Sequence, residues 1–232
     1  MNIQILHMVP GARAATGLTV IIDVFRAFTV ETYLARANAD KIIPVGDVQV
    51  ALDYKAAHSE TTILCGERNG IMIEGFDYGN SPSQLDGADL RGKTVIHTTS
   101  AGTQGIANAV NADEILGGSL VNAKAIAEYI RQKNPDTVSL VCMGLNAECQ
   151  TEEDNLCAEY IKSLLEGKPI SDMDKQMDEL RHTSGAKFFD PDRPEFPEPD
   201  FGLSIALNTC NFVLRLKNSP DGLHYMERID IL

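Results

Sequence analysis

Charged and hydroxyl side chains follow several short apolar runs of this chain, at the points where β-strands are predicted to end. In open parallel sheets, ligands bind beyond the carboxyl ends of the strands. We therefore expect these side chains to meet at one edge of a sheet and to bind a small ligand there. The residues concerned are Asp23 and Arg26; Glu67 and Arg68; Thr98, Thr99, Ser100, Gly102 and Thr103; Asn122; and Glu153 and Asp154.

The turn HTTSAGTQG, residues 97–105, is the clearest candidate for binding an anion. It leads from a predicted strand into a predicted helix, and it carries four hydroxyl groups and a glycine before the helix. Backbone N–H groups at a helix start point outward and favour a phosphate or a sulfonate. The alternative is that these hydroxyls only cap an ordinary turn. The turn is not a Walker loop, because no G-K-[ST] follows it.

The segment IIDVFRAFT places Asp23 at a strand end and Arg26 three residues later. Burying an unpaired carboxylate is costly, so Asp23 needs a partner. It could ligate a metal, act as a nucleophile, or form an internal ion pair with Arg26. The D-x-D pattern of haloacid-dehalogenase-type nucleophiles does not apply, because the second acidic position is Phe25.

The acidic run EED, residues 152–154, opens a predicted helix. Acidic residues there complement the helix dipole, so a purely structural N-terminal role is one interpretation. The other is a magnesium site, because Mg²⁺ binds one or two carboxylates together with water and substrate oxygens.

The irregular stretch GERNGIMIEGFDYGNSPSQL, residues 66–85, contains four glycines with charged residues among them. Glycine allows tight turns and close backbone approach. Glu67 and Arg68 leave a predicted strand where a ligand should lie, and Asp77, Asn80 and Ser81 are expected to return to the same edge of the sheet. We interpret the stretch as one wall of the site.

Composition restricts the function. The 232 residues carry a formal net charge of −13 at pH 7, which argues against a nucleic-acid partner. An anionic ligand would be repelled at long range, so its site must concentrate positive charge from arginine, lysine, helix N-termini or a divalent metal. No apolar run approaches the roughly 18 residues of a membrane span, and no secretory signal pattern opens the chain. We expect a cytoplasmic protein that has no membrane partner.

Cysteine and histidine spacing gives no metal or disulfide pattern. The five cysteines are odd in number and lack C-x-x-C spacing. Cys142, at the end of an apolar run, is expected to be a buried small side chain, with a place at the mouth of the site as the alternative. The five histidines lack ligand spacing and are expected to be structural or exposed; His97 alone lies near the predicted site.

Short apolar runs rich in β-branched residues alternate with segments of helical periodicity up to about residue 168. This alternation predicts a three-layer α/β/α fold with a largely parallel, mixed sheet, in one domain spanning residues 1–232. The predicted strands are 18–24, 41–45, 61–65, 93–98, 113–120 and 137–143. The predicted helices are 28–39, 47–59, 104–112, 121–133 and 151–167.

The alternation fades in the C-terminal part. We expect a surface helix at 171–182, a long acidic loop with four prolines at 184–201, a helix at 203–216 and a closing edge strand at 224–232. A loop of that length is usually functional or mobile, and it could close over the site. Its acidity argues against direct contact with a polyanion unless a metal intervenes. The apolar C-terminal segment leaves a homodimer open.

Five blocks of the chain, in this order and at these separations, resemble the 2-phosphosulfolactate phosphatase family. They are IIDVFRAFTV, GERNGIMIEGFDYGNSP, HTTSAGTQGI, GSLVNAKAIA and TEEDNLCAEYI, and the resemblance extends from about residue 18 to residue 167. It implies an α/β/α fold and Mg²⁺-dependent hydrolysis of (R)-2-phospho-3-sulfolactate to sulfolactate and phosphate. In methanogens this reaction belongs to coenzyme M biosynthesis.

The resemblance covers every candidate residue named above, with one departure. Family members often carry asparagine at the position of Ser100, which keeps a polar side chain there. We assign Asp23, Arg26, Glu67 and Arg68 as catalytic candidates, and Asp23, Glu67, Glu153 and Asp154 as metal-ligand candidates. The substrate-binding candidates are Asp77, Asn80, Ser81, Thr98, Thr99, Ser100, Gly102, Thr103 and Asn122.

Three points stay open at this stage. The attack on phosphorus could use water directly or an enzyme nucleophile, for which Asp23 is a better candidate than Ser100 or Cys142. The substrate could be another small phosphoester, because a chain can keep its anion site while the substrate changes. The fold could also serve as a non-catalytic anion-binding module.

Overall fold

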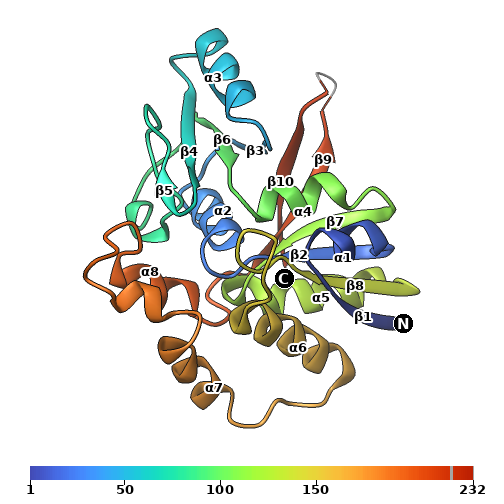
Figure 1. Ribbon diagram of the computed structural model, residues 1–232. Helices are drawn as coiled ribbons and strands as arrows, with labels where there is room; N and C mark the ends of the chain where they lie inside the picture. The colour runs from blue at the N-terminus through green and yellow to red at the C-terminus, as the bar shows by residue number, and fades with distance from the viewer. Residues whose placement is uncertain (220–221, 232) are drawn as a thin grey trace.

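Ten strands form a mixed sheet in the computed structural model, which describes residues 1–219 and 222–231 (Figure 1). Their order across the sheet is β1-β8-β2-β7-β9-β10-β3-β6-β4-β5. The strands are β1 (Asn2–His7), β2 (Gly17–Ile22), β3 (Lys41–Pro44), β4 (Thr62–Arg68), β5 (Ile71–Met72), β6 (Thr94–Thr98), β7 (Ala112–Gly118), β8 (Thr137–Cys142), β9 (Phe212–Asn218) and β10 (His224–Asp230).

The sheet consists of two parallel blocks joined by an antiparallel hairpin. Strands β1, β8, β2 and β7 pair in parallel, and so do β3, β6 and β4. The hairpin β9–β10 lies between them, and β10 meets β3 only where Met226 pairs with Ile42. Figure 1 shows the strands of the two blocks running in different directions. Because this junction is so short, the sheet can turn there and bring the carboxyl ends of both blocks toward one site.

Helices cover both faces of the first block. Along β2, Ile21 belongs to a core shared with α1, α2 and α4, whereas Val20 and Ile22 belong to a core shared with α5 and α6. This alternation follows from the two-residue period of a strand. The helices are α1 (Met8–Ala14), α2 (Ala27–Arg36), α3 (Val48–Ala57), α4 (Gly102–Asn108), α5 (Ala123–Lys133), α6 (Glu152–Glu166), α7 (Met173–Glu179) and α8 (Glu198–Ser204).

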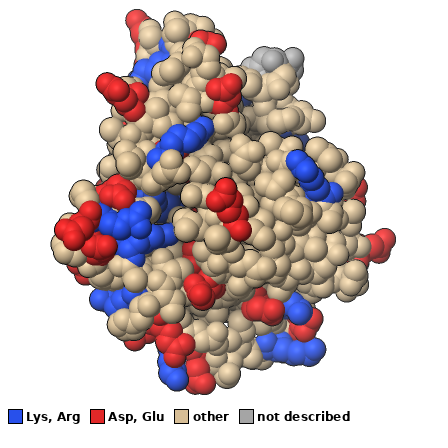
Figure 2. Space-filling view, in the orientation of Figure 1, with Lys and Arg blue, Asp and Glu red and all other residues tan. Residues whose placement is uncertain are grey.

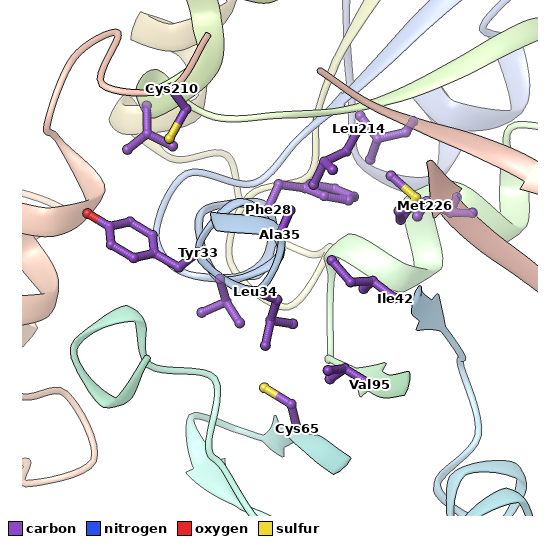
Figure 3. Close-up of a cluster of buried hydrophobic side chains, with 14 of the residues drawn as sticks. Phe28, Tyr33, Leu34, Ala35, Ile42, Cys65, Val95, Cys210, Leu214 and Met226 are labelled. Carbon is purple, nitrogen blue, oxygen red and sulfur yellow. The ribbon is translucent and has the colours of Figure 1, made fainter. Parts of the chain in front are cut away.

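Helix α2 fills the angle between the two blocks. In Figure 3 it is seen along its axis, with Cys65 and Val95 on one side and Leu214 and Met226 on the other. Nine of its ten residues are buried, although Thr29, Glu31 and Thr32 among them are polar. The start of this helix is therefore fixed by packing from both blocks, and that start carries Asp23 and Arg26.

The expected three-layer α/β/α architecture with a largely parallel, mixed sheet is confirmed. That residues 1–232 form one domain stays a prediction. Among the described residues, no helix is long and apolar enough to cross a membrane.

Three details of the C-terminal and N-terminal regions differ from expectation. The predicted helix at 203–216 is wrong: after α8 the chain turns at Asn208, which has φ of 58°, and enters strand β9. The predicted closing strand exists as β10, but it lies inside the sheet between β9 and β3, not at an edge, and Leu232 falls outside the described residues. Strand β1, which the alternation did not reveal, forms one edge of the sheet.

The sequence of β9 explains why a helix was predicted there. Phe212, Val213 and Leu214 are consecutive buried residues, because this strand is covered on both faces and paired on both sides. A short continuous apolar run has no periodicity of its own, so it can be mistaken for a buried helix.

Candidate active site

A cavity of about 270 Å³ opens where strands of both blocks end. Its wall comes from the segments that follow β2, β4, β6 and β8, and from the segment between α7 and α8. The residues that line it are Asp23, Phe25, Arg26, Glu67, Asn69, Gly70, Asn80, Thr99, Ser100, Ala101, Gly144, Leu145, Asn146, Glu153, Lys187, Arg193 and Phe196. Seven of the predicted site residues are among them: Asp23, Arg26, Glu67, Asn80, Thr99, Ser100 and Glu153.

Asp23 lies directly after β2, at the base of the cavity. Its Oδ1 accepts a hydrogen bond from the backbone N–H of Ala27 at 3.3 Å. Burial raises the pKa of Asp23 to about 7, repulsion from Glu153 and Glu67 adds to the rise, and the Ala27 bond opposes it. A carboxyl group with a pKa near neutrality can hold or release a proton, or take a cation, at physiological pH.

Gly102 leaves room beside this carboxylate. A Cβ at Gly102 would lie 2.8 Å from the Cβ of Ala27 and 3.3 Å from Oδ2 of Asp23. Glycine is therefore required for α4 to approach the start of α2. Gly102 itself does not line the cavity.

Glu153 and Asp154 begin helix α6 but face different surroundings. Both oxygens of Asp154 accept backbone N–H groups at 2.8 Å, from Val24 and from Gly144, so this carboxylate ties together the segments after β2 and β8. Glu153 lines the cavity, and its Oε2 is buried without a hydrogen-bond partner among the described residues. Burial raises the pKa of both carboxyl groups.

Arg26 has a strained backbone at the N-terminal end of α2. Its φ of 114° and ψ of −52° lie outside the regions that residues with a Cβ normally adopt. Such strain costs on the order of 1–3 kcal/mol and tends to occur at functional sites. The guanidinium donates to the carbonyl of Glu195 at 2.8 Å and lies 4.2 Å from the ring centre of Phe196. Burial lowers its pKa, and Glu67 opposes that shift.

The segment between α7 and α8 supplies basic residues that were not predicted for the site. Lys187, from the short 3₁₀ helix Ala186–Phe189, lines the cavity with its ammonium 5.4 Å from the Phe25 ring and 5.2 Å from the Phe196 ring. Arg193 lines the same cavity. Figure 2 shows basic and acidic side chains gathered side by side on the flank that Figure 1 labels α8.

The charge of that segment is divided between cavity and solvent. Asp190, Asp192 and Glu198 are exposed, while Lys187 and Phe196 face the cavity. The expectation that its acidity argues against contact with a polyanion unless a metal intervenes stays a prediction, but the residues of this segment that line the cavity include the basic Lys187 and Arg193. Two basic residues in an otherwise acidic stretch were the only signal in the sequence. Burial lowers the pKa of Lys187, and Glu153 opposes that shift.

Glu67 joins two loops of the cavity wall. Its Oε2 accepts the backbone N–H of Gly70 at 2.7 Å, and its Oε1 accepts that of Ser100 at 2.7 Å. The Ser100 hydroxyl donates to Oε2 at 3.2 Å. The carboxylate of Glu67 thus occupies part of the anion site that we expected a substrate to use at the 97–105 turn.

Replacing Glu67 by glutamine should lower the free energy of unfolding by about 1–3 kcal/mol, because the NH₂ group of glutamine would face one of the two backbone N–H donors. Urea denaturation measures the change, and Glu148→Gln, an exposed site nearby, is the matched control. Equal stability of the Glu67→Gln variant and the parent would contradict this bridging role.

The remaining residues of the 97–105 turn mostly bond within the protein. Arg68 donates to Thr98 Oγ1 at 2.8 Å and to the carbonyl of Gly46 at 3.0 Å, outside the cavity. The Thr103 hydroxyl donates to the carbonyl of Thr99 at 2.9 Å. This arrangement agrees with the alternative that these hydroxyls cap a turn, although Thr99 and Ser100 still line the cavity.

Besides Thr98, Gly102 and Thr103, three more predicted substrate-binding residues lie away from the cavity. Asp77 accepts the backbone N–H of Leu64 and pairs with Lys55 at 2.5 Å. Ser81 donates to Asp200 at 2.8 Å, and Asn122 accepts the backbone N–H of Ser119 at 3.0 Å. Each of these side chains organises a loop, and none contacts the cavity. Of residues 77–81, only Asn80 lines the cavity.

The loop after β8 adds three residues that were not among the candidate site residues. Gly144, Leu145 and Asn146 line the cavity, and Asn146 and Ala147 have φ of 52° and 60°. Two consecutive residues with positive φ form a turn that only its surroundings stabilise. Cys142, just before this loop, is buried, which confirms the first of its two interpretations; burial raises the pKa of its thiol.

Two carboxylates of the cavity suit a divalent cation. No group of three or more histidine, cysteine, aspartate or glutamate side chains in a metal-binding arrangement occurs within residues 1–219 and 222–231. Mg²⁺ needs only one or two carboxylates beside water and substrate oxygens. Asp23 and Glu153 both line the cavity, and the unpartnered Oε2 of Glu153 is a free ligand atom. These two residues fit the ion, whereas the oxygens of Glu67 and Asp154 are engaged by backbone N–H groups.

Comparison with known proteins identifies the family of this chain. Residues 4–188 match the family model described as 2-phosphosulpholactate phosphatase. Three similar proteins are each named "Probable 2-phosphosulfolactate phosphatase". The protein from Bacillus subtilis is 30% identical over 90% of both chains. That from Caldicellulosiruptor saccharolyticus is 42% identical over 62% of this chain and 61% of its own. That from Caldanaerobacter subterraneus is 41% identical over 54% of this chain and 52% of its own.

The matched region thus spans about half to three-fifths of the length of the last two relatives. The family match covers Asp23, Glu67, Glu153 and Lys187 and most of the chain. The chain belongs to the 2-phosphosulfolactate phosphatase family.

Proposed function

We propose that the protein is a phosphoric monoester hydrolase that releases phosphate from (R)-2-phospho-3-sulfolactate and leaves (R)-3-sulfolactate. The observation that carries this proposal is the meeting of Asp23 and Glu153 with Lys187 and Arg26 in one cavity. Acidic groups that can take a cation or a proton lie there beside permanent or protonated cations, as hydrolysis of a polyanionic ester requires. The family match and the names of the relatives support the same substrate.

The basic residues of the cavity would attract an anionic substrate that the acidic protein as a whole repels. The substrate carries phosphate, sulfonate and carboxylate groups. Lys187 and Arg193 supply cations from the segment before α8, and Arg26 supplies one at the base. Arginine binds such planar or tetrahedral anions through several N–H groups at once. A volume of about 270 Å³ restricts the site to small ligands.

Mg²⁺ belongs to this proposal, with Asp23 and Glu153 as the residues that would hold it. When bound, the ion would neutralise charge on the phosphoryl oxygens and assist departure of the ester oxygen. The protein holds both carboxylates in place through the Ala27 N–H and through helix α6.

Asp23 is the best-placed group to move a proton or to attack phosphorus. Its Oδ1 is engaged by Ala27, so Oδ2, beside Gly102, is the atom free to hold a proton. Cys142 is buried behind the strand end and Ser100 donates to Glu67, which leaves both less suited to nucleophilic attack. Direct attack by water and a covalent intermediate on Asp23 both remain open.

A phosphate-release screen tests the proposal. Phosphosulfolactate, phosphoglycolate, phosphoglycerate and phospholactate are compared with and without Mg²⁺. We expect Mg²⁺-dependent release that is fastest from phosphosulfolactate. Faster release from phosphoglycerate would assign the site to another small phosphoester, and no release from any compound would favour a non-catalytic anion-binding module.

A cytoplasmic location and a homodimer stay predictions from the sequence, and a place in coenzyme M biosynthesis stays an implication of the family resemblance.

A further inference from the structure

A line of three buried polar side chains leads from the interior to the cavity. Glu31 lies on α2, His97 on β6 and Asn80 in the loop before the 3₁₀ helix Pro82–Gln84. The Nδ1 of His97 lies 2.9 Å from Glu31 Oε1, and its Nε2 lies 3.3 Å from Asn80 Oδ1. Glu31, His97 and Asn80 are 1%, 0% and 6% exposed. Of the three, only Asn80 lines the cavity.

The hydrogen-bonding capacity of each group fixes the direction of this line. Both atoms that face the imidazole ring are acceptors, one a carboxylate oxygen and the other an amide oxygen. As placed, the two contacts require a hydrogen on each ring nitrogen, so that Nδ1 donates to Glu31 and Nε2 donates to Asn80. Because Oδ1 of Asn80 accepts from His97, its Nδ2 points away from the ring. This NH₂ group donates to none of the described residues and is available to a ligand.

The backbone around Asn80 is held as firmly as its side chain. The preceding residue, Gly79, donates its N–H to Gln84 Oε1 at 2.8 Å, and its carbonyl accepts from the Cys65 thiol at 3.1 Å. Ser81, which follows, donates to Asp200. These contacts fix the backbone at Asn80, so the orientation of its amide is set by the contact with His97, as in a pre-organised donor.

A structural role alone does not explain the choice of residues. Figure 3 shows buried apolar side chains packed around α2, with Leu34, Cys65 and Val95 close together. Well-packed apolar residues of similar volume often stabilise a fold as well as a buried polar pair does, or better. Oε2 of Glu31 is moreover buried with no partner in the described part of the chain, which adds to the cost.

We propose that Glu31 and His97 are positioning residues that turn the amide of Asn80 so that its Nδ2 donates into the cavity, to an anionic oxygen of the substrate. This inference rests on the proposed function and adds to it a neutral donor beside the cations. With glutamine at position 31, the ring could keep a single hydrogen, on Nδ1, and donate it to the glutamine oxygen. Nε2 would then be an acceptor, the Asn80 amide would rotate to donate to it, and Oδ1 would replace Nδ2 in the cavity.

Glu31→Gln tests this mechanism with almost no change in shape. The probe is inorganic phosphate, titrated calorimetrically into the full chain in the presence of Mg²⁺. We expect Glu31→Gln and Asn80→Ala each to weaken phosphate binding about tenfold or more, as loss of a hydrogen bond to a charged group does. The double variant should bind no more weakly than Asn80→Ala alone, because both changes remove one donor. His58→Gln, an exposed histidine, is the control.

A second readout is the protonation of the His97 ring, measured by NMR in the parent and in Glu31→Gln. Nitrogen chemical shifts of the His97 ring should show both nitrogens protonated in the parent and one in Glu31→Gln. Unchanged phosphate affinity in either single variant, additive losses in the double variant, or a singly protonated His97 in the parent would each overturn the proposal. These outcomes are independent of turnover: a parent that hydrolyses no phosphoester defeats the proposed function, whereas the binding and ring measurements still decide the role of Glu31 and His97.

Discussion

Asp23→Asn should lower kcat/KM for phosphosulfolactate about a thousandfold, within the range that loss of an acid–base group or of a metal ligand produces. Asparagine keeps the volume of the side chain and can still accept the N–H of Ala27. It cannot hold a proton at Oδ2, attack phosphorus or carry the charge that a cation needs. All three roles open to Asp23 are lost together, which makes this the largest expected effect in the cavity.

The same substitution should stabilise the fold at alkaline pH. The pKa of Asp23 rises from 3.8 to about 7 because the carboxyl group is buried. A group with a raised pKa in the folded state contributes stability that is complete below the unfolded value and is lost as pH increases through the folded value. Above pH 7 the free energy of unfolding of the parent is lowered by the whole of this contribution, about 4 kcal/mol for a pKa difference between 3.8 and about 7. The Asp23→Asn variant has no carboxyl group at this position and does not lose that stability.

Two measurements check the prediction, both against Asp113→Asn, an exposed aspartate, as control. Phosphate release gives kcat/KM, and urea denaturation without divalent cations gives the free energy of unfolding at pH 5 and pH 8. The stability gain should be larger at pH 8. Activity retained within tenfold of the parent would remove Asp23 from the catalytic group. Single turnover in ¹⁸O-water, followed by analysis of the Asp23 carboxyl for label, separates covalent from direct attack.

Local patterns were sufficient to predict the elements that alternate. The runs before Asp23, Glu67 and Thr98 are buried strands, and each leads its polar residue to a strand end as expected. What the sequence did not reveal is how strands far apart in the chain are arranged. The central position of β9 and β10 depends on pairing with β7 and β3, which are about 100 and about 180 residues away. No short-range periodicity encodes such a pairing.

The residues of the candidate site likewise fall into those that local sequence predicts and those that only tertiary packing brings to the cavity. Residues immediately after strands, such as Asp23, Glu67 and Ser100, were found because the strand-end rule places them. Lys187 comes from a segment without periodicity, and only tertiary packing against Phe25 and Phe196 brings it to the cavity. Conversely, Asn122 follows a strand as the rule requires but does not reach the cavity. Its side chain accepts the backbone N–H of Ser119 and donates to the carbonyl of Gly117, and such local hydrogen bonds compete with ligand binding.

Lys187→Met is expected to lower kcat/KM by about 10- to 100-fold, mainly through a higher KM, because a charge-assisted contact to the substrate contributes on this scale. Methionine retains the apolar stem that packs beside Phe25, Phe188 and Phe196, so the wall of the cavity should persist. Lys187→Arg should recover part of the loss, because it restores the positive charge. Lys175→Met, on the exposed surface of α7, is the control.

The pH profile of kcat/KM distinguishes this role from a purely structural one. The positive charge of Lys187 opposes the burial that raises the pKa of Asp23 and of Glu153. Removing the charge raises both pKa values further, so the acidic limb of the profile should move to higher pH in Lys187→Met and return toward the parent position in Lys187→Arg. A lower kcat/KM with an unmoved acidic limb would contradict this role. It would show that the ammonium group of Lys187 does not affect the pKa of Asp23, and that the substitution acts on the cavity through packing alone.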